Sequence, residues 1–133
     1  MILVLDASVC VAALVDSGND GHWAESKVAG ANLVAPQLIL VEVTNVLRRL
    51  SASGSLSDLD ASIAHNDLLT MTIELYPFAP LADRIWSLRH NLSSYDAYYV
   101  ALAESLNAPL ATLDNRLINA PGTSCEFITT APR

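Results

Sequence analysis

Residues 2–8 read Ile-Leu-Val-Leu-Asp-Ala-Ser, and this stretch decides the fold. Four apolar residues in a row, ended by a charge, indicate a short strand that is buried on both faces, as in parallel sheets. Asp6 follows the strand directly. Ligands of open α/β sheets bind outside the carboxyl ends of the strands. The stretch therefore predicts a parallel α/β sheet that carries Asp6 at its ligand-binding edge.

The rest of the chain alternates between short apolar runs and segments with helical periodicity. Helices are expected over residues 7–15, 22–29, 37–52, 57–70, 79–90, 95–106 and 114–119, and strands over 2–5, 32–35, 72–76, 109–113 and 125–128. Strands that alternate with helices form parallel βα units with right-handed crossovers. We expect an α/β fold, a three-layer α/β/α sandwich whose central, mainly parallel sheet has about five strands, with the first strand in its centre.

The composition is that of a folded domain. Hydrophobic residues make up 52% of the 133 residues and charged residues 16%, which is more apolar surface than one small domain hides. We therefore expect a single domain over residues 1–133 that binds a protein partner or a second copy of itself. No apolar run reaches the roughly 18 residues of a membrane span, and no signal peptide is recognisable, so a cytoplasmic location is expected.

The net charge of −7 argues against a nucleic acid partner, because polyanions are bound by Lys and Arg. Carboxylates that gather in one site around divalent cations reverse this argument locally. The placement of the 14 acidic residues therefore matters more than their sum.

Four acidic residues are candidates for such a site. Asp6 and Asp114 each follow a predicted strand, and neighbouring parallel strands end on one edge, roughly 5 Å apart. Asp96 lies in the first turn of a buried helix that begins at that edge. Glu42 lies inside the apolar stripe of the helix over 37–52, where an unpaired charge is costly.

A cluster of carboxylates requires a cation, since two like charges 4 Å apart cost about 4 kcal/mol at an effective dielectric constant near 20. An all-oxygen donor set favours Mg²⁺ or Mn²⁺. Mg²⁺ held by carboxylates shares its remaining positions with waters and substrate phosphates. The acids therefore predict metal-dependent hydrolysis of phosphodiester bonds.

Each acid also has a purely structural explanation. Asp6 or Asp114 would serve as a helix N-cap. Asp96 would favour the dipole of its helix wherever it lies. The glutamate would form a salt bridge with Arg49 or Arg89.

Four segments together resemble a known family. They are the apolar strand with Asp6-Ala7-Ser8, residues 42–47 (EVTNVL), residues 94–103 (SYDAYYVALA) and residues 111–114 (ATLD). This pattern resembles the PIN domain and, within it, the VapC-type toxins of bacterial toxin–antitoxin pairs. The resemblance runs through the whole chain, and Y-D-A-x-Y-V-A-L-A together with T-x-D is its most specific part.

The resemblance implies a PIN-like fold and an Mg²⁺-dependent endoribonuclease for which Mn²⁺ would substitute. It also implies a homodimer that is held inactive by a VapB-type antitoxin. The residues that match the family's catalytic and metal-binding acids are Asp6, Glu42, Asp96 and Asp114, and those that match its supporting polar residues are Ser8, Asn45 and Thr112.

Basic residues that would contact RNA phosphates are Arg116, Arg49 and Arg89, and each has an ordinary solvated surface charge as its alternative. Arg116 is the best candidate because it follows Asp114 by two residues.

Two other functions remain open. A receiver-like Mg²⁺-binding signalling domain requires a lysine after a late strand, and the only lysine, Lys27, lies early in the chain. An inactive PIN-like binding scaffold is disfavoured because all four acids are present. A haloacid-dehalogenase-type phosphatase would carry Asp where Ser8 stands.

Overall fold

The structure, a computed structural model, describes residues 1–130. Its centre is a five-stranded parallel sheet in the order β3-β2-β1-β4-β5. The strands are β1 (Ile2–Leu5), β2 (Asn32–Pro36), β3 (Ile73–Tyr76), β4 (Leu110–Ala111) and β5 (Phe127–Ile128). The predicted fold class and the central place of the first strand are confirmed. The predicted single domain ends at residue 133, and its last three residues lie outside the described part of the chain.

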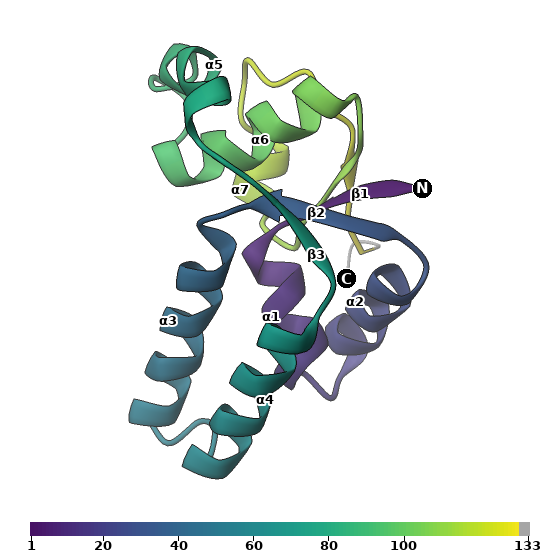
Figure 1. The fold of residues 1–133 in the computed structure, drawn as a ribbon, viewed down its shortest axis with the longest axis vertical. Coiled ribbons are helices and arrows are strands. Elements are labelled where there is room, and N and C mark those ends of the chain that lie inside the picture. Colours follow the sequence, from purple (N-terminus) through teal and green to yellow (C-terminus); the bar gives the residue numbers. More distant parts are fainter. Residues whose placement is uncertain (131–133) are drawn as a thin grey trace.

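Helices cover both faces of the sheet. They are α1 (Ala7–Val15), α2 (Asn19–Ala29), α3 (Ile39–Ala52), α4 (Asp58–Thr70), the 3-10 helix η1 (Ala79–Leu81), α5 (Ala82–Ser87), α6 (Ser94–Leu106) and α7 (Asn115–Ile118). Helices α1 to α4 lie on one side of the sheet, and α5 and α6 lie on the other (Figure 1). None of the helices in residues 1–130 is both long enough and apolar enough to cross a membrane.

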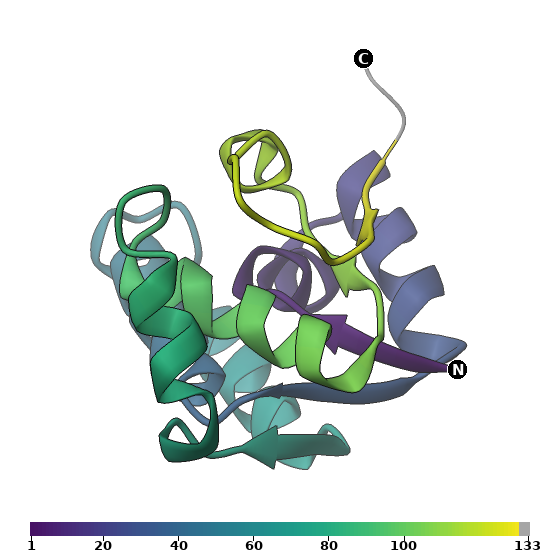
Figure 2. The same ribbon diagram turned by 90° about the horizontal axis from the view of Figure 1, so that it is seen from above.

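Helix α6 packs across the middle of the sheet, over β1 and β2 (Figure 2). Its residues 97–103 are all buried, as its nearly continuous apolar sequence predicts. Ser93 is the N-cap of α6, and its Oγ accepts a hydrogen bond from the backbone N–H of Asp96 at 3.2 Å. The buried helix therefore begins with Asp96 in its first turn.

Most of the predicted elements begin or end at other residues in the structure. The helix expected over 79–90 ends at Ser87, because the carbonyls of Ile85 and Trp86 accept amides three residues ahead and close the last turn tightly. The helix expected from residue 22 begins at Asn19. The strand expected over 109–113 is limited to Leu110–Ala111. The amide of Thr112 still bonds to the carbonyl of Ile128, but the amides of Leu113 and Asp114 bond to side-chain hydroxyls at the end of the sheet.

Candidate active site

Asp6 lies at the carboxyl end of β1 and is 7% exposed. Its Oδ1 accepts the backbone N–H of Ala7 at 2.8 Å, so it is the N-cap of α1. Its Oδ2 accepts the hydroxyls of Ser8 and Thr112, each at 2.7 Å. Burial raises the pKa of Asp6, and these three hydrogen bonds oppose that rise. The structural role and the candidate site role of Asp6 therefore coexist.

Two hydroxyls connect the ends of the central strands. The fully buried Thr112 donates to Asp6 and accepts the N–H of Asp114 at 3.0 Å, while Ser8 Oγ accepts the N–H of Leu113 at 3.1 Å. Every buried side-chain nitrogen or oxygen within residues 1–130 has a hydrogen-bond partner. The segments after β1 and β4 are thereby held beside each other, as expected for neighbouring parallel strands.

Asp114 is the N-cap of α7, and its Oδ1 accepts the backbone N–H of Arg116 at 2.9 Å. The guanidinium of Arg116 lies 3.4 Å from both carboxylate oxygens, and its side chain is 92% exposed. These distances exceed the 2.7–2.9 Å that is typical of a strong charge-assisted hydrogen bond. The arginine is therefore held only loosely at the edge of the site.

Asp96 is half-buried at the start of α6. Burial raises the pKa of its carboxyl, and repulsion from Asp6 and Asp114 adds to the rise. The hydrogen bond with Ser93 and the positive charge of Arg116 act in the opposite direction. Asp96 therefore shares one electrostatic environment with residues at the ends of β1 and β4.

Glu42 lies in the first turn of α3, and its partner is Tyr99 of α6. The Tyr99 hydroxyl donates to Glu42 Oε1 at 2.8 Å, although 57 residues separate them. Burial raises the pKa of Glu42, repulsion from Asp6 and Asp96 adds to it, and the Tyr99 hydrogen bond lowers it. Within residues 1–130, Glu42 has no ion pair with an arginine, so the salt-bridge alternative is wrong there.

Tyr99 is the site residue that sequence reasoning missed. It follows Asp96 by three residues, which places it on the same side of α6 one turn later. A tyrosine in the middle of a fully apolar helix requires a partner for its hydroxyl. That requirement is the signal that could have identified it.

The four acids lie in one another's field, yet they do not form a compact ligand shell. Within residues 1–130, no three His, Cys, Asp or Glu side chains are close enough to enclose an ion, as expected for carboxylates that repel one another. The donors are all oxygens, and burial and repulsion raise the pKa values of Asp6, Glu42 and Asp96. This chemistry fits a hard divalent cation.

Three other predicted residues lie apart from this group. Asn45 is exposed on α3, and its Oδ1 accepts Nε of Arg48 at 2.9 Å rather than supporting the acids. Arg89 lies over the ring of Trp86, 4.6 Å from its centroid. Arg49 is exposed on α3. Of the three predicted RNA contacts, Arg116 is the one that pairs with an acid of this group.

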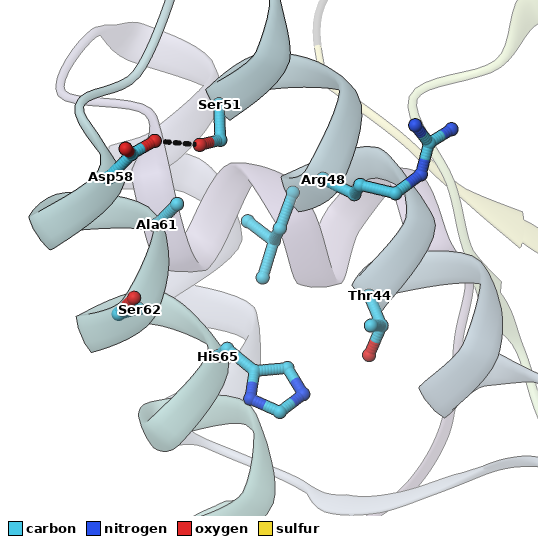
Figure 3. Close-up of a pocket in the computed structure, with 8 residues that line it drawn as sticks. Thr44, Arg48, Ser51, Asp58, Ala61, Ser62 and His65 are labelled. Carbon is cyan, nitrogen blue, oxygen red and sulfur yellow. Dashed lines mark hydrogen bonds between the residues drawn. The ribbon is translucent and has the colours of Figure 1, made fainter.

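A cavity of about 360 Å³ lies between α3 and α4 (Figure 3). Thr44, Arg48 and His65 are among its lining residues, and Ser51 donates to Asp58 at one end. None of the four acids lines it.

The sequence model of the PIN domain matches residues 3–122. The chain belongs to the PIN-domain family. This PIN domain is 41% identical to ribonuclease VapC9 of Mycobacterium tuberculosis over 132 residues, which cover 99% of this chain and 100% of the relative. It is 40% identical to ribonuclease VapC1 of the same organism over 125 residues, or 93% and 94% of the two chains. It is thus a member of the VapC ribonuclease family.

Solved structures share the fold at low identity. VapC20 of Mycobacterium tuberculosis, a sarcin-ricin loop cleaving toxin, has a TM-score of 0.69 at 18% identity over 92% of this chain and 96% of that chain. VapBC2 of Rickettsia felis has a TM-score of 0.68 at 17% identity, and the match covers 97% of this chain and 98% of that chain. The receiver-like alternative is wrong, because receiver domains order their strands 2-1-3-4-5 and this PIN domain does not.

Proposed function

We propose that this protein is the endoribonuclease toxin of a toxin–antitoxin pair, and that it hydrolyses RNA phosphodiester bonds with Mg²⁺ at the four acids. The observation that carries the proposal is the electrostatic interaction among Asp6, Glu42, Asp96 and Asp114 near the carboxyl edge of the sheet. They come from four separate parts of the chain, and burial together with repulsion from other acids of the group raises the pKa values of Asp6, Glu42 and Asp96. The identity of 41% to a VapC ribonuclease supports the same activity.

The four carboxylates would hold Mg²⁺, for which Mn²⁺ would substitute. When bound, such an ion would supply Lewis-acid chemistry, namely a lower pKa for a bound water and stabilisation of negative charge on the phosphodiester. The chain itself orients Asp6 through the hydroxyls of Ser8 and Thr112, so this carboxylate needs no rearrangement to bind. Arg116, beside Asp114 and Asp96, would bind the RNA phosphate through its planar guanidinium.

The proposed partner is a VapB-type antitoxin. We expect two copies of this chain to form a homodimer in the cytoplasm, which the antitoxin holds inactive. Solved neighbours include VapBC2 and VapBC-5, a member of a toxin–antitoxin family. Helix α4 carries Leu59 and Ile63, which are 69% and 51% exposed and lie four residues apart on one face. Ile63 borders a cavity of about 200 Å³ that Leu14 and Val15 of α1 also line. Such apolar surface suits a protein partner.

The test is RNA cleavage by the purified chain with Mg²⁺, before and after excess EDTA, and with Mn²⁺ added back. Asp96→Asn should abolish cleavage and leave the melting temperature close to that of the wild type. Asp6→Ala should also abolish it, with some loss of stability because Asp6 caps α1. Glu25→Gln, which removes one charge from exposed α2, is the matched control and should retain activity.

Full cleavage by Asp96→Asn would exclude the acidic site, and cleavage that resists EDTA would exclude the metal. A wild-type chain that cleaves no RNA under any of these conditions would be the inactive scaffold.

A further inference from the structure

A cavity of about 430 Å³ lies directly beside Asp96, between the segment that precedes α6 and helix α7. Its lining residues are Asn91, Leu92, Ser93, Asp96, Arg116 and Leu117. We propose that this cavity binds one nucleotide of the substrate, with its phosphate at Arg116 and its base at Asn91. The assignment rests on the proposed function, because Asp96 belongs to both the cavity and the acidic site. The volume is within the range of roughly 300–1,000 Å³ that is typical of small-molecule sites.

Arg116 supplies the phosphate end of the cavity. Its side chain is 92% exposed and its contacts with Asp114 are 3.4 Å long, so a phosphate can replace them at little cost. The planar fork of a guanidinium matches two phosphate oxygens at once. In a chain of net charge −7, a cation at this position directs a polyanion to one place.

Leucines and an amide supply the nucleoside end. Leu92 and Leu117 both line the cavity, and the half-buried Leu92 offers an apolar surface to a base or a ribose. The exposed Asn91 carries both a donor and an acceptor, which is what recognition of a base edge in single-stranded RNA requires.

The C-terminal loop leaves space for Asn91. A Cβ atom on Gly122 would lie 2.9 Å from Nδ2 of Asn91, and Gly122 has a φ of +87°, which favours glycine. The carbonyl of Gly122 accepts a hydrogen bond from Nη2 of Arg84 at 2.9 Å, and Nε of Arg84 donates to Glu104 of α6. The loop that bounds Asn91 is therefore fixed to the helix that carries Asp96.

Nucleotide binding is tested first without cleavage. Isotope-labelled protein with Mg²⁺ is titrated with the four nucleoside 5′-monophosphates and, separately, with inorganic phosphate, and the backbone amide signals are followed by NMR. Nucleotides should shift the signals of Asn91, Leu92 and Leu117, whereas phosphate alone should act only near Arg116. Identical responses to both probes, or no response at these residues, would overturn the proposal.

Cleavage kinetics give the second test. Asn91→Ala and Arg116→Gln should each raise KM for RNA about tenfold, with kcat within about twofold of the wild type, as expected for loss of a contact made in the ground state. Asn91→Ala should also change which bases flank the cleaved bond. Arg48→Gln is the matched control, because Arg48 is an exposed arginine of the α3–α4 cavity (Figure 3) and should leave KM unchanged.

The two proposals fail in different ways. Cleavage that is unaffected by Asn91→Ala and Arg116→Gln overturns the nucleotide site and leaves the nuclease intact; the cavity then serves a protein partner or nothing. Nucleotide shifts at Asn91 in a chain that cleaves no RNA support the cavity and refute the nuclease. A rise in KM that Arg48→Gln reproduces shows a general charge effect and overturns the site.

Discussion

Tyr99→Phe removes one oxygen atom from the interior of α6 and leaves the rest of a fully buried side chain in place. The lost contact is the 2.8 Å hydrogen bond to Glu42 Oε1. A hydrogen bond to a charged group is worth about 1.5–3 kcal/mol, so its loss corresponds to roughly a ten- to a hundredfold change in an equilibrium. The same range is typical for loss of an outer partner of a metal ligand. We therefore expect the Mg²⁺ concentration for half-maximal RNA cleavage to rise by that factor.

The pH dependence of RNA cleavage should also change in Tyr99→Phe. The Tyr99 hydroxyl favours the ionised form of Glu42 against burial and against repulsion by Asp6 and Asp96. Without this donor the pKa of Glu42 rises further, and the ascending limb of the rate against pH moves to higher pH. The assay is initial rate at several Mg²⁺ concentrations and pH values, together with thermal melting of each variant.

Tyr98→Phe is the matched control for this experiment. Tyr98 is the preceding residue, it is also buried, and its hydroxyl donates to the backbone carbonyl of Tyr76 instead of to an acid. It should lose stability without a change in Mg²⁺ requirement. An equal Mg²⁺ requirement in Tyr99→Phe and Tyr98→Phe would refute the view that Tyr99 positions Glu42.

Two carboxyls should respond to pH with opposite sign. Burial and repulsion raise the pKa of Glu42 in the folded protein, so the ionised carboxylate costs stability once the pH exceeds the pKa of an ordinary glutamate. In EDTA, the variant Glu42→Gln should therefore have a melting temperature several degrees above that of the wild type at pH 7. Near pH 4 it should show no gain. A lower melting temperature at pH 7 contradicts this. Burial also acts on Glu104, but hydrogen bonds from Arg84 and Ser124 hold its pKa below the usual range, so its contribution disappears as the pH falls. Glu104→Gln should cost about 1–2 kcal/mol in urea denaturation at pH 7, at the lower end because Arg84 is 41% exposed; an unchanged midpoint would contradict it.

The sheet and its order of elements were predictable because β1 and α6 have patterns that few other structures satisfy. An apolar run ended by Asp6 suits a central parallel strand, and residues 97–103 are apolar on every side and are buried on every side. The ends of elements were not predictable in the same way. The amide of Leu113 bonds to the hydroxyl of Ser8, which lies 105 residues earlier in the chain, and no local pattern records this contact.

The site was predictable as a set of residues but not as a set of contacts. Asp6 and Asp114 are both helix N-caps, and this role leaves their proposed role in the site open, so the two alternatives posed for them were not exclusive. The partner of Glu42 is a neutral hydroxyl from another helix, whereas sequence reasoning considered only arginines as alternatives to a metal. Long-range pairs of this kind depend on packing, which one sequence does not reveal.

The hydrogen bond between Thr112 and Asp6 joins residues that are 106 positions apart. While the chain is being synthesised, Thr112 is added 106 residues after Asp6. Strand β4, which leads into Thr112, must pair with β1 before the carboxylate is held in place. Contacts between distant parts of a chain form late in folding. A growing chain therefore carries an unfinished site until Thr112 has been added and β4 has paired with β1, and until then it lacks the contact that orients Asp6.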